Sequence, residues 1–297
     1  MEILNIEENF LGLEEEFSSL EKSRIVVVSA PYEYTVSYGG GTENGPKGIL
    51  EASQYVEFYD DETDREICFE QGIASLRPID FEGVNGKAVL DKIYEQVRAM
   101  LELDKFVVTL GGEHTISTAP IKAHFERYPD MSILHFDAHS DLRDEYEGTK
   151  YSHASIMARV MEFFPPRRLT QVGIRAQCKE EADFIKQNGV NTFYASAIRR
   201  GLHGEDWQKR VVESLGDEIY VTFDVDYFDP SIMPATGTPE PDGFLYNETL
   251  EVFREIRRAG KRIIGLDVNE LAPIEQLSHP DILSARLIYK ILNFVFS

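Results

Sequence analysis

Short runs of apolar and β-branched residues recur along the chain, and amphipathic stretches separate them. Runs of this length predict strands, and the stretch with Val89, Ile93, Val97 and Met100 on one side predicts a helix. Gly260, just before a new apolar run, is expected to end a helix. The predicted strands are residues 25–28, 106–110, 133–136, 170–174, 219–223 and 262–266, and the predicted helices are residues 89–101, 121–128, 156–164, 180–187, 207–215, 248–260 and 282–296.

The alternation of strands and helices predicts the α/β class, with a mostly parallel sheet flanked by helices on both faces. No repeat, low-complexity block or linker divides the sequence, so we expect a single doubly wound domain over residues 1–297. In sheets of this kind, ligand sites lie at the carboxyl ends of the strands.

The charge balance is strongly acidic, because 30 Lys and Arg residues stand against 52 Asp and Glu residues, for a formal net charge of −22. Nucleic acid and anionic membranes both require basic surface, so we expect neither as a partner. A cationic small substrate would be attracted, although such a charge can equally serve solubility alone.

Two cysteines, Cys68 and Cys178, are too few for a disulfide framework, and no CxxC motif offers a thiolate metal site. The acidic N-terminal segment lacks the basic and apolar regions of a signal peptide, and no apolar run reaches the roughly 18–20 residues of a membrane span. We therefore expect a cytoplasmic protein.

Unusual polar residues directly follow the predicted strands. They are His114 after residues 106–110, Asp137, His139 and Asp141 after residues 133–136, and Asp224 and Asp226 after residues 219–223. Extended backbone points alternate residues to the same side, so each group can face one point. Taken singly, each group can also be a helix cap or a solvated turn.

Packing this many carboxylates together is costly unless cations neutralise them. Four Asp and two His side chains supply enough ligands for two divalent cations that share carboxylates. Because oxygen donors dominate and no cysteine is present in these groups, Mn²⁺ fits best, with Ni²⁺, Zn²⁺ and Fe²⁺ as alternatives.

Three segments that contain these residues resemble the signatures of the ureohydrolase family, the arginase/agmatinase group of binuclear manganese hydrolases. They are GGEHT at residues 111–115, HFDAHSD at residues 135–141 and TFDVDYFDPSIMPATGTPEPDGF at residues 222–244. The likeness extends from APYEYTVSYGGGTENGPKGI near the start to LDVNELAP near the end. It implies one doubly wound domain with an eight-stranded parallel sheet, and homo-oligomers that are trimers or hexamers.

The resemblance also implies a role for each matching residue. His114 and Asp141 would bind one manganese ion only, His139 and Asp226 would bind the other, and Asp137 and Asp224 would bridge the two. Glu270 would pair with the guanidinium of the substrate, and Asp141 would pass a proton to the leaving amine. His153 would shuttle protons at the mouth of the site.

The expected substrate is a cationic guanidino compound, most simply agmatine, which would yield urea and putrescine. Asp144, Glu145 and Glu147 follow the candidate ligands, and at the mouth of the site they would repel the carboxylate of arginine and attract a distal ammonium. The same acids can equally form an exposed charged loop. N1-aminopropylagmatine, which would yield spermidine, is the alternative substrate.

Other functions stay open at this point. A mononuclear zinc deacetylase shares this fold, but the additional His114, Asp141 and Asp226 favour two metals. Arginase, guanidinobutyrase and formimidoylglutamate hydrolase are nearer alternatives, and for the anionic substrates of the last two Arg143 is the one basic candidate near the motifs. A non-catalytic binding relative would be expected to have lost ligands.

Three further features adjoin the motifs. Glu113, beside His114, is expected to start a helix or to support a metal ligand. His135 is expected either to pack in the core or to face the site. The run Gly39-Gly40-Gly41 lacks the frame of a phosphate-binding loop and is expected to be a flexible loop near the site.

Overall fold

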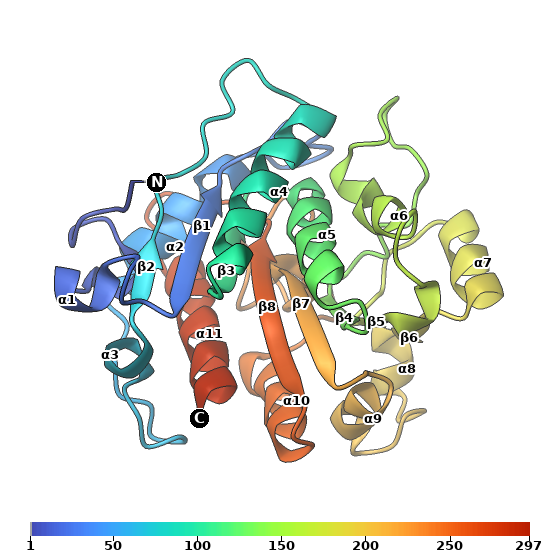
Figure 1. The fold of residues 1–297 in the computed structure, drawn as a ribbon. Helices are drawn as coiled ribbons and strands as arrows, with labels where there is room; N and C mark the ends of the chain where they lie inside the picture. The colour runs from blue at the N-terminus through green and yellow to red at the C-terminus, as the bar shows by residue number, and fades with distance from the viewer. Residues whose placement is uncertain (1) are drawn as a thin grey trace.

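The structure of the protein is a computed structural model that describes residues 2–297. Eight strands form one sheet in the order β2-β1-β3-β8-β7-β4-β5-β6, and every neighbouring pair is parallel (Figure 1). The strands are β1 (Ile25–Ala30), β2 (Ile73–Ser75), β3 (Phe106–Gly111), β4 (Ser132–Phe136), β5 (Leu169–Val172), β6 (Asn191–Phe193), β7 (Glu218–Asp224) and β8 (Arg262–Asn269).

Helices cover both faces of the sheet. Helices α4 and α5 lie over one face, and α2, α10 and α11 pack against the other (Figure 1). The helices are α1 (Glu15–Ser18), α2 (Gly45–Ser53), α3 (Ile67–Gln71), α4 (Lys87–Glu102), α5 (Thr118–Arg127), α6 (Ile156–Val160), α7 (Lys179–Asn188), α8 (Ala195–Arg199), α9 (Trp207–Glu213), α10 (Tyr246–Arg258) and α11 (His279–Phe296).

Strand β1 shows how the sequence builds this arrangement. Val26 and Val28 belong to the apolar cluster that includes α4, whereas Ile25 and Val27 belong to the cluster that includes α2 and α11. Because successive side chains of a strand point to opposite faces, a strand covered on both faces needs an unbroken apolar run. The α/β class, the parallel sheet and the flanking helices predicted from the sequence are confirmed.

All six predicted strands are present, but β2 and β6 were not predicted. Each has three residues at an edge of the sheet, too short to leave a pattern. The helix predicted over residues 156–164 ends at Val160, and Pro165 disfavours helical backbone at the residue before it. Gly260 ends α10 as expected, with a φ of 67° just before β8.

Strands β3, β8, β7 and β4 are consecutive neighbours in the centre of the sheet. Their carboxyl ends therefore meet at one edge, and the motif residues predicted from the sequence lie there. The parallel order of the strands thus brings together residues that lie far apart in the chain.

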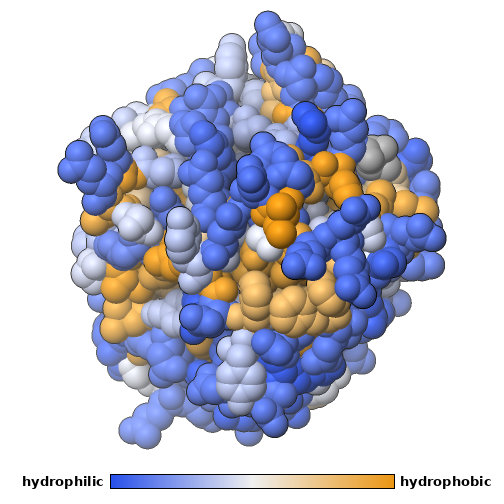
Figure 2. Space-filling view, turned by 90° about the vertical axis from the view of Figure 1, so that its left-hand side faces the viewer, coloured by the Kyte–Doolittle hydropathy of each residue, from blue (hydrophilic) through white to orange (hydrophobic). Residues whose placement is uncertain are grey.

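The outer surface is mainly polar. Figure 2 shows one face of the molecule, on which hydrophilic side chains cover most of the surface and hydrophobic ones gather in patches between them. Within residues 2–297, none of the helices combines the length and apolar character that a membrane crossing needs.

Candidate metal centre and active site

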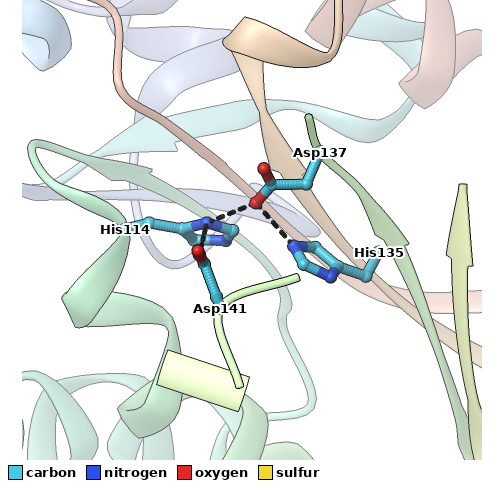
Figure 3. Close-up of side chains that lie close together, drawn as sticks. All are labelled: His114, His135, Asp137 and Asp141. Atoms are coloured by element: carbon cyan, nitrogen blue, oxygen red, sulfur yellow. Dashed lines mark hydrogen bonds and ion pairs between the residues drawn. The ribbon is translucent and has the colours of Figure 1, made fainter. Parts of the chain in front are cut away.

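The end of β3 places His114 at the centre of the candidate site (Figure 3). Its Nδ1 atom lies 3.1 Å from Oδ2 of Asp137, 3.3 Å from Oδ2 of Asp141 and 3.3 Å from Oδ2 of Asp224. His114 is buried, and Nδ1 forms no hydrogen bond with any residue in the described part of the chain. A buried nitrogen that faces three carboxylates is suited to bind a cation together with them.

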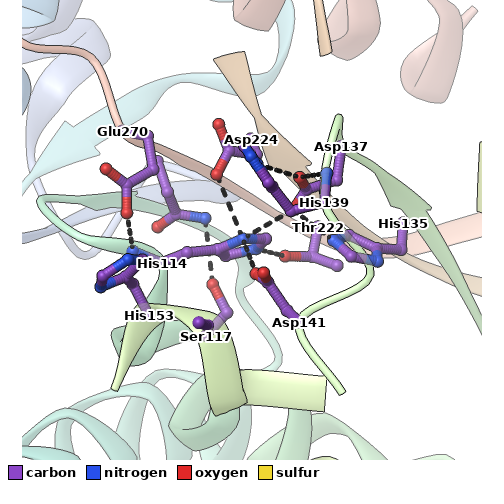
Figure 4. Close-up of polar contacts among 12 residues, drawn as sticks. His114, Ser117, His135, Asp137, His139, Asp141, His153, Thr222, Asp224 and Glu270 are labelled. Carbon is purple, nitrogen blue, oxygen red and sulfur yellow. Dashed lines mark hydrogen bonds and ion pairs between the residues drawn. The ribbon is translucent and has the colours of Figure 1, made fainter. Parts of the chain in front are cut away.

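A second group of ligand atoms adjoins the first and shares Asp137 with it. Nδ1 of His139 lies 2.8 Å from Oδ2 of Asp226 and 3.6 Å from Oδ1 of Asp137. The end of β7 joins the two groups, because Oδ1 of Asp224 accepts a hydrogen bond of 2.8 Å from the backbone N–H of Asp226. The two overlapping groups hold five of the six predicted ligands together with His135, and Asp224 joins them through its contacts with His114 and Asp226. Figure 4 shows His114, Asp137, His139, Asp141 and Asp224 facing one another.

Electrostatics also favour cations at this position. Burial, together with the charge of Asp137, raises the pKa of Asp141 to about 7. Burial and the charges of Asp226 and Asp137 raise the pKa of Asp224 well above its usual value. Burial opposes ionisation of Asp137 as well, but the adjoining histidines hold the pKa of this carboxyl well below its usual range. Divalent cations would offset the burial and the repulsion that raise the pKa values of Asp141 and Asp224, so the donor set fits metal binding.

The ring of His114 is oriented from behind by a chain of hydrogen bonds. Oγ1 of Thr222 donates to Oδ1 of Asp267 over 2.7 Å and lies 2.9 Å from Nε2 of His114. The Thr222 hydroxyl gives its hydrogen to Asp267, so it accepts the hydrogen on Nε2, and Nδ1 points toward the carboxylates. Thr222 and Asp267 were not predicted from the sequence, although Thr222 precedes Asp224 by two positions on β7 and must face the same side.

His135 faces the site rather than the apolar core. Its Nε2 lies 2.7 Å from Oδ2 of Asp137, and Nε2 of Gln171 lies 3.1 Å from its Nδ1. Burial lowers the pKa of His135, which favours the neutral ring. Gln171 therefore donates to Nδ1, and His135 donates to Asp137.

Glu270 follows β8 with a φ of 66°, and its side chain is buried. Its Oε1 accepts a 2.6 Å hydrogen bond from the backbone N–H of His114, which ties it to the candidate metal centre (Figure 4). Burial raises the pKa of Glu270 well above its usual value. A cationic group beside this carboxylate would restore its charged form.

The glycine run lies near the site, as expected. Gly39 N–H donates to the carbonyl of Gly237 over 3.0 Å, and a Cβ on Gly237 would lie 2.7 Å from the carbonyl oxygen of Gly39 and 3.8 Å from Oε2 of Glu270. Side chains are excluded there because the two backbones touch.

A cavity of about 510 Å³ opens above the carboxylates, and His153 lies in its wall. The other lining residues come from loops and from the first turn of α7: Ser37, His139, Asp141, Arg143, Tyr146, Ala154, Arg175, Ala176, Gln177, Glu181, Thr238 and Glu240. Arg175 donates to backbone carbonyls of loop residues that include Asp226 and Glu240, so its guanidinium is occupied in holding the wall.

The three acids expected at the mouth do not line this cavity. Asp144 pairs with Arg159 at 2.7 Å and with Lys150 at 3.4 Å. A turn closed by hydrogen bonds between Tyr146 and Thr149 leaves Glu147 in solvent, and Glu145 is exposed as well. This geometry favours the alternative of an exposed charged loop.

The fold and the site together define a class: an α/β protein with a His/Asp cluster that could hold metal ions at the carboxyl edge of a parallel sheet. The sequence model of the Arginase family matches residues 23–293, and the chain belongs to that family.

Similar proteins agree with this membership. The chain is 35% identical over 286 residues to an N(1)-aminopropylagmatine ureohydrolase of Synechocystis sp., covering 94% of this chain and 92% of that protein. It is 35% identical over 260 residues to an agmatinase of Bacillus cereus, covering 86% of each. A crystal structure of a putative agmatinase from Clostridium difficile superposes with a TM-score of 0.84 at 28% identity, covering 93% of this chain and 98% of that one.

Proposed function

We propose that this protein is a binuclear metal-dependent hydrolase that cleaves agmatine to urea and putrescine. As a member of the Arginase family with agmatinase relatives, the chain is a hydrolase that cleaves a C–N bond of a guanidino compound. The observation that carries the proposal is the pair of carboxylate–histidine groups that share Asp137, with Glu270 hydrogen-bonded at their edge.

In this proposal, His114 and Asp141 hold one cation, His139 and Asp226 hold the other, and Asp137 and Asp224 are shared. Mn²⁺ is the proposed ion because four of these six ligands are carboxylates, and Ni²⁺, Zn²⁺ or Fe²⁺ could replace it. Two such cations, when bound, act as Lewis acids that make a water molecule acidic and nucleophilic near neutral pH.

Glu270 is the proposed guanidinium ligand. The backbone of His114 occupies Oε1, which leaves Oε2 for charge-assisted hydrogen bonds with the substrate. Guanidinium is a poor electrophile because its charge is delocalised, so the site must hold its carbon in a fixed position for attack. The positive φ of Glu270 and its hydrogen bond to His114 give this carboxylate a fixed place.

Two residues are proposed to move protons. Asp141 takes a proton from the attacking water and delivers it to the leaving amine nitrogen, which yields urea and a primary amine. His153, in the wall of the cavity, exchanges protons with bulk solvent at its Nε2 atom.

N1-aminopropylagmatine is the second candidate substrate and would yield spermidine. It is favoured by the Synechocystis relative and by the open cavity, which leaves room for a longer chain beyond the guanidinium. The cavity wall carries charges of both signs, Arg143 and Arg175 with Glu181 and Glu240, so wall charge alone does not choose between the candidates. The net charge of −22 supports a cationic substrate over arginine or guanidinobutyrate.

Urea release from four substrates tests this function: agmatine, N1-aminopropylagmatine, arginine and guanidinobutyrate, each with metal-replete protein. We expect kcat/KM for agmatine to exceed the values for arginine and guanidinobutyrate by at least about 100-fold. Preference for N1-aminopropylagmatine would establish the second candidate. Preference for arginine would refute both candidate substrates, but the protein would still be a ureohydrolase.

The domain organisation, the oligomeric state and the cellular location are part of the same proposal. We infer a single domain over residues 1–297, since strands from both halves of the chain interleave in one sheet. We also infer a homo-oligomer, a trimer or a hexamer, located in the cytoplasm, where the free thiols of Cys68 and Cys178 would persist.

A further inference from the structure

The N-terminal loop that follows β1 contacts His153 directly. Oγ1 of Thr35 lies 3.2 Å from Nδ1 of His153 and also accepts a 3.1 Å hydrogen bond from the backbone N–H of His153. On the other side of the ring, Oγ of Ser37 lies 3.3 Å from Nε2. Two residues far away in the sequence therefore hold the histidine that lines the cavity.

Thr35 is in turn held by Glu113 at the end of β3. Oε2 of Glu113 accepts three hydrogen bonds: from the N–H of Tyr34 at 2.9 Å, the N–H of Thr35 at 2.7 Å and Oγ1 of Thr35 at 3.0 Å. Both Thr35 and Glu113 are buried. Because two backbone N–H groups already point at Oε2, this oxygen can only accept, and the Thr35 hydroxyl must donate to it.

This bonding fixes which nitrogen of His153 carries the hydrogen. The hydroxyl of Thr35 gives its only hydrogen to Glu113, so toward His153 it can only accept. Nδ1 must then carry the hydrogen of the neutral ring, and Nε2 keeps its lone pair. Nε2 faces Ser37, another residue of the cavity wall.

We propose that Thr35 and Glu113 are positioning residues for His153, which they hold in the Nδ1–H form with Nε2 as the acceptor that faces Ser37 at the cavity wall. This inference rests on the proposed role of His153 in proton transfer. A base that is oriented through a third group is a recurring arrangement in catalysis, and here a threonine hydroxyl connects the carboxylate to the imidazole.

Glu33, in the loop that contains Thr35, provides a matched comparison for Glu113. Oε2 of Glu33 accepts from the N–H of Gly41 and the N–H of Thr42, each over 2.6 Å, and from Oγ1 of Thr42 over 2.8 Å. The bonding repeats that of Glu113 and Thr35, but no contact joins Thr42 to a histidine in the described part of the chain. Thr42 therefore anchors the loop but does not position a histidine, so a change at Thr42 is the matched control.

The first test is kinetic. Thr35→Val should lower kcat about tenfold or more while KM and metal content stay near the original values, and Thr35→Ser should restore most of the rate. In a His153→Asn background, Thr35→Val should have less than about a twofold further effect, because the threonine acts through that histidine. Thr42→Val should retain kcat within about twofold. An equal loss from Thr35→Val with and without His153 would overturn the proposal.

The second test reads the proton position and does not depend on activity. Nitrogen-15 spectra of histidine side chains in Zn²⁺-loaded protein, with the His153 signals assigned by their loss in His153→Asn, should show the Nδ1–H form. Thr35→Val should abolish this preference, and Thr42→Val should keep it. An Nε2–H form in the unaltered protein would refute the proposal, even if Thr35→Val fails to fold.

The two tests separate this proposal from the proposed function. If no guanidino compound releases urea, the proposed function fails, and the spectra still decide whether Thr35 and Glu113 fix the ring. If urea is released and His153→Asn is fully active, the catalytic importance of the positioning is refuted while the ureohydrolase function stands.

Discussion

At the scale of single residues, two side chains of the site lie on unusual backbone. Asp141 has a φ of 54° and Glu270 a φ of 66°, in the left-handed region that residues other than glycine rarely adopt. Such conformations cost about 1–3 kcal/mol each and persist where the surrounding structure enforces them. Both residues are buried beside His114, which agrees with roles that need a fixed carboxylate position.

Glu270→Gln should lower kcat/KM for agmatine by about 100-fold or more, because the amide keeps the shape but loses the charge that pairs with guanidinium. Metal content should not change. Glu275→Gln changes an exposed side chain in the following loop and is the matched control, so it should leave kcat/KM near the original value. Near-normal turnover in metal-replete Glu270→Gln protein would show that another group orients the substrate.

The exposed acids Asp144, Glu145 and Glu147 are not expected to affect the choice of substrate. Changing Asp144, Glu145 and Glu147 together to their amides should leave the ratio of agmatine to arginine kcat/KM within about twofold, because these side chains do not line the cavity. The assay should be made at low and at moderate salt. A change of tenfold or more at both salt concentrations would place the acids at the mouth after all.

At the scale of elements, the sequence predicts the central strands and the ligands that follow them, because fully buried strands are continuous apolar runs ending in unusual polar residues. It does not predict β2 and β6, which are too short to show a pattern. It also does not show that Asp144 pairs with Arg159 on α6. The contacts of Thr35 with His153 and of Thr222 with His114 depend on pairings between distant segments, which no local pattern encodes.

The carboxyl end of β7 offers a direct test of shared ligands. Asp224→Asn should reduce the bound metal as well as the rate, because a carboxylate that serves both ions is removed. Asp217→Asn, exposed just before the opposite end of β7, should retain two metals per chain and full activity. Two tightly bound metals and full activity in Asp224→Asn would refute the assignment.

An ion-pair cluster distant from the site joins the loop after α2 to α10 and α11. Glu62 pairs with Arg254 at 2.7 Å and with Lys290 at 3.0 Å. The hydrogen bond from Arg254 outweighs burial and lowers the pKa of Glu62 to about 2. Because the folded pKa lies below the unfolded one, the pairing stabilises the protein above the unfolded pKa of about 4.3, and this contribution is lost as pH falls toward 2.

Glu62→Gln should therefore lower Tm at pH 7 by about 1–3 °C, and the difference from the unaltered protein should shrink at pH 3. Thermal unfolding at the two pH values checks this. Glu95→Gln removes an exposed pair within α4 and should leave Tm unchanged at both. A Tm difference for Glu62→Gln that is as large at pH 3 as at pH 7 would contradict the ion-pair account.

At the scale of the whole molecule, function follows from the order of the strands. Four central neighbours end at one edge and bring His114, Asp137, Asp224 and Glu270 together, although these residues span more than half of the chain. The formal net charge of −22 favours the approach of cations, both metal ions and a guanidinium substrate.

The central claim is that two cations at this edge support hydrolysis of agmatine. The most direct measurement is urea release from agmatine as Mn²⁺ is added stepwise to chelator-treated protein. We expect little activity without metal and a rise that saturates at two equivalents per chain. Full activity at one equivalent or without metal, or no urea at two equivalents, would contradict the central claim.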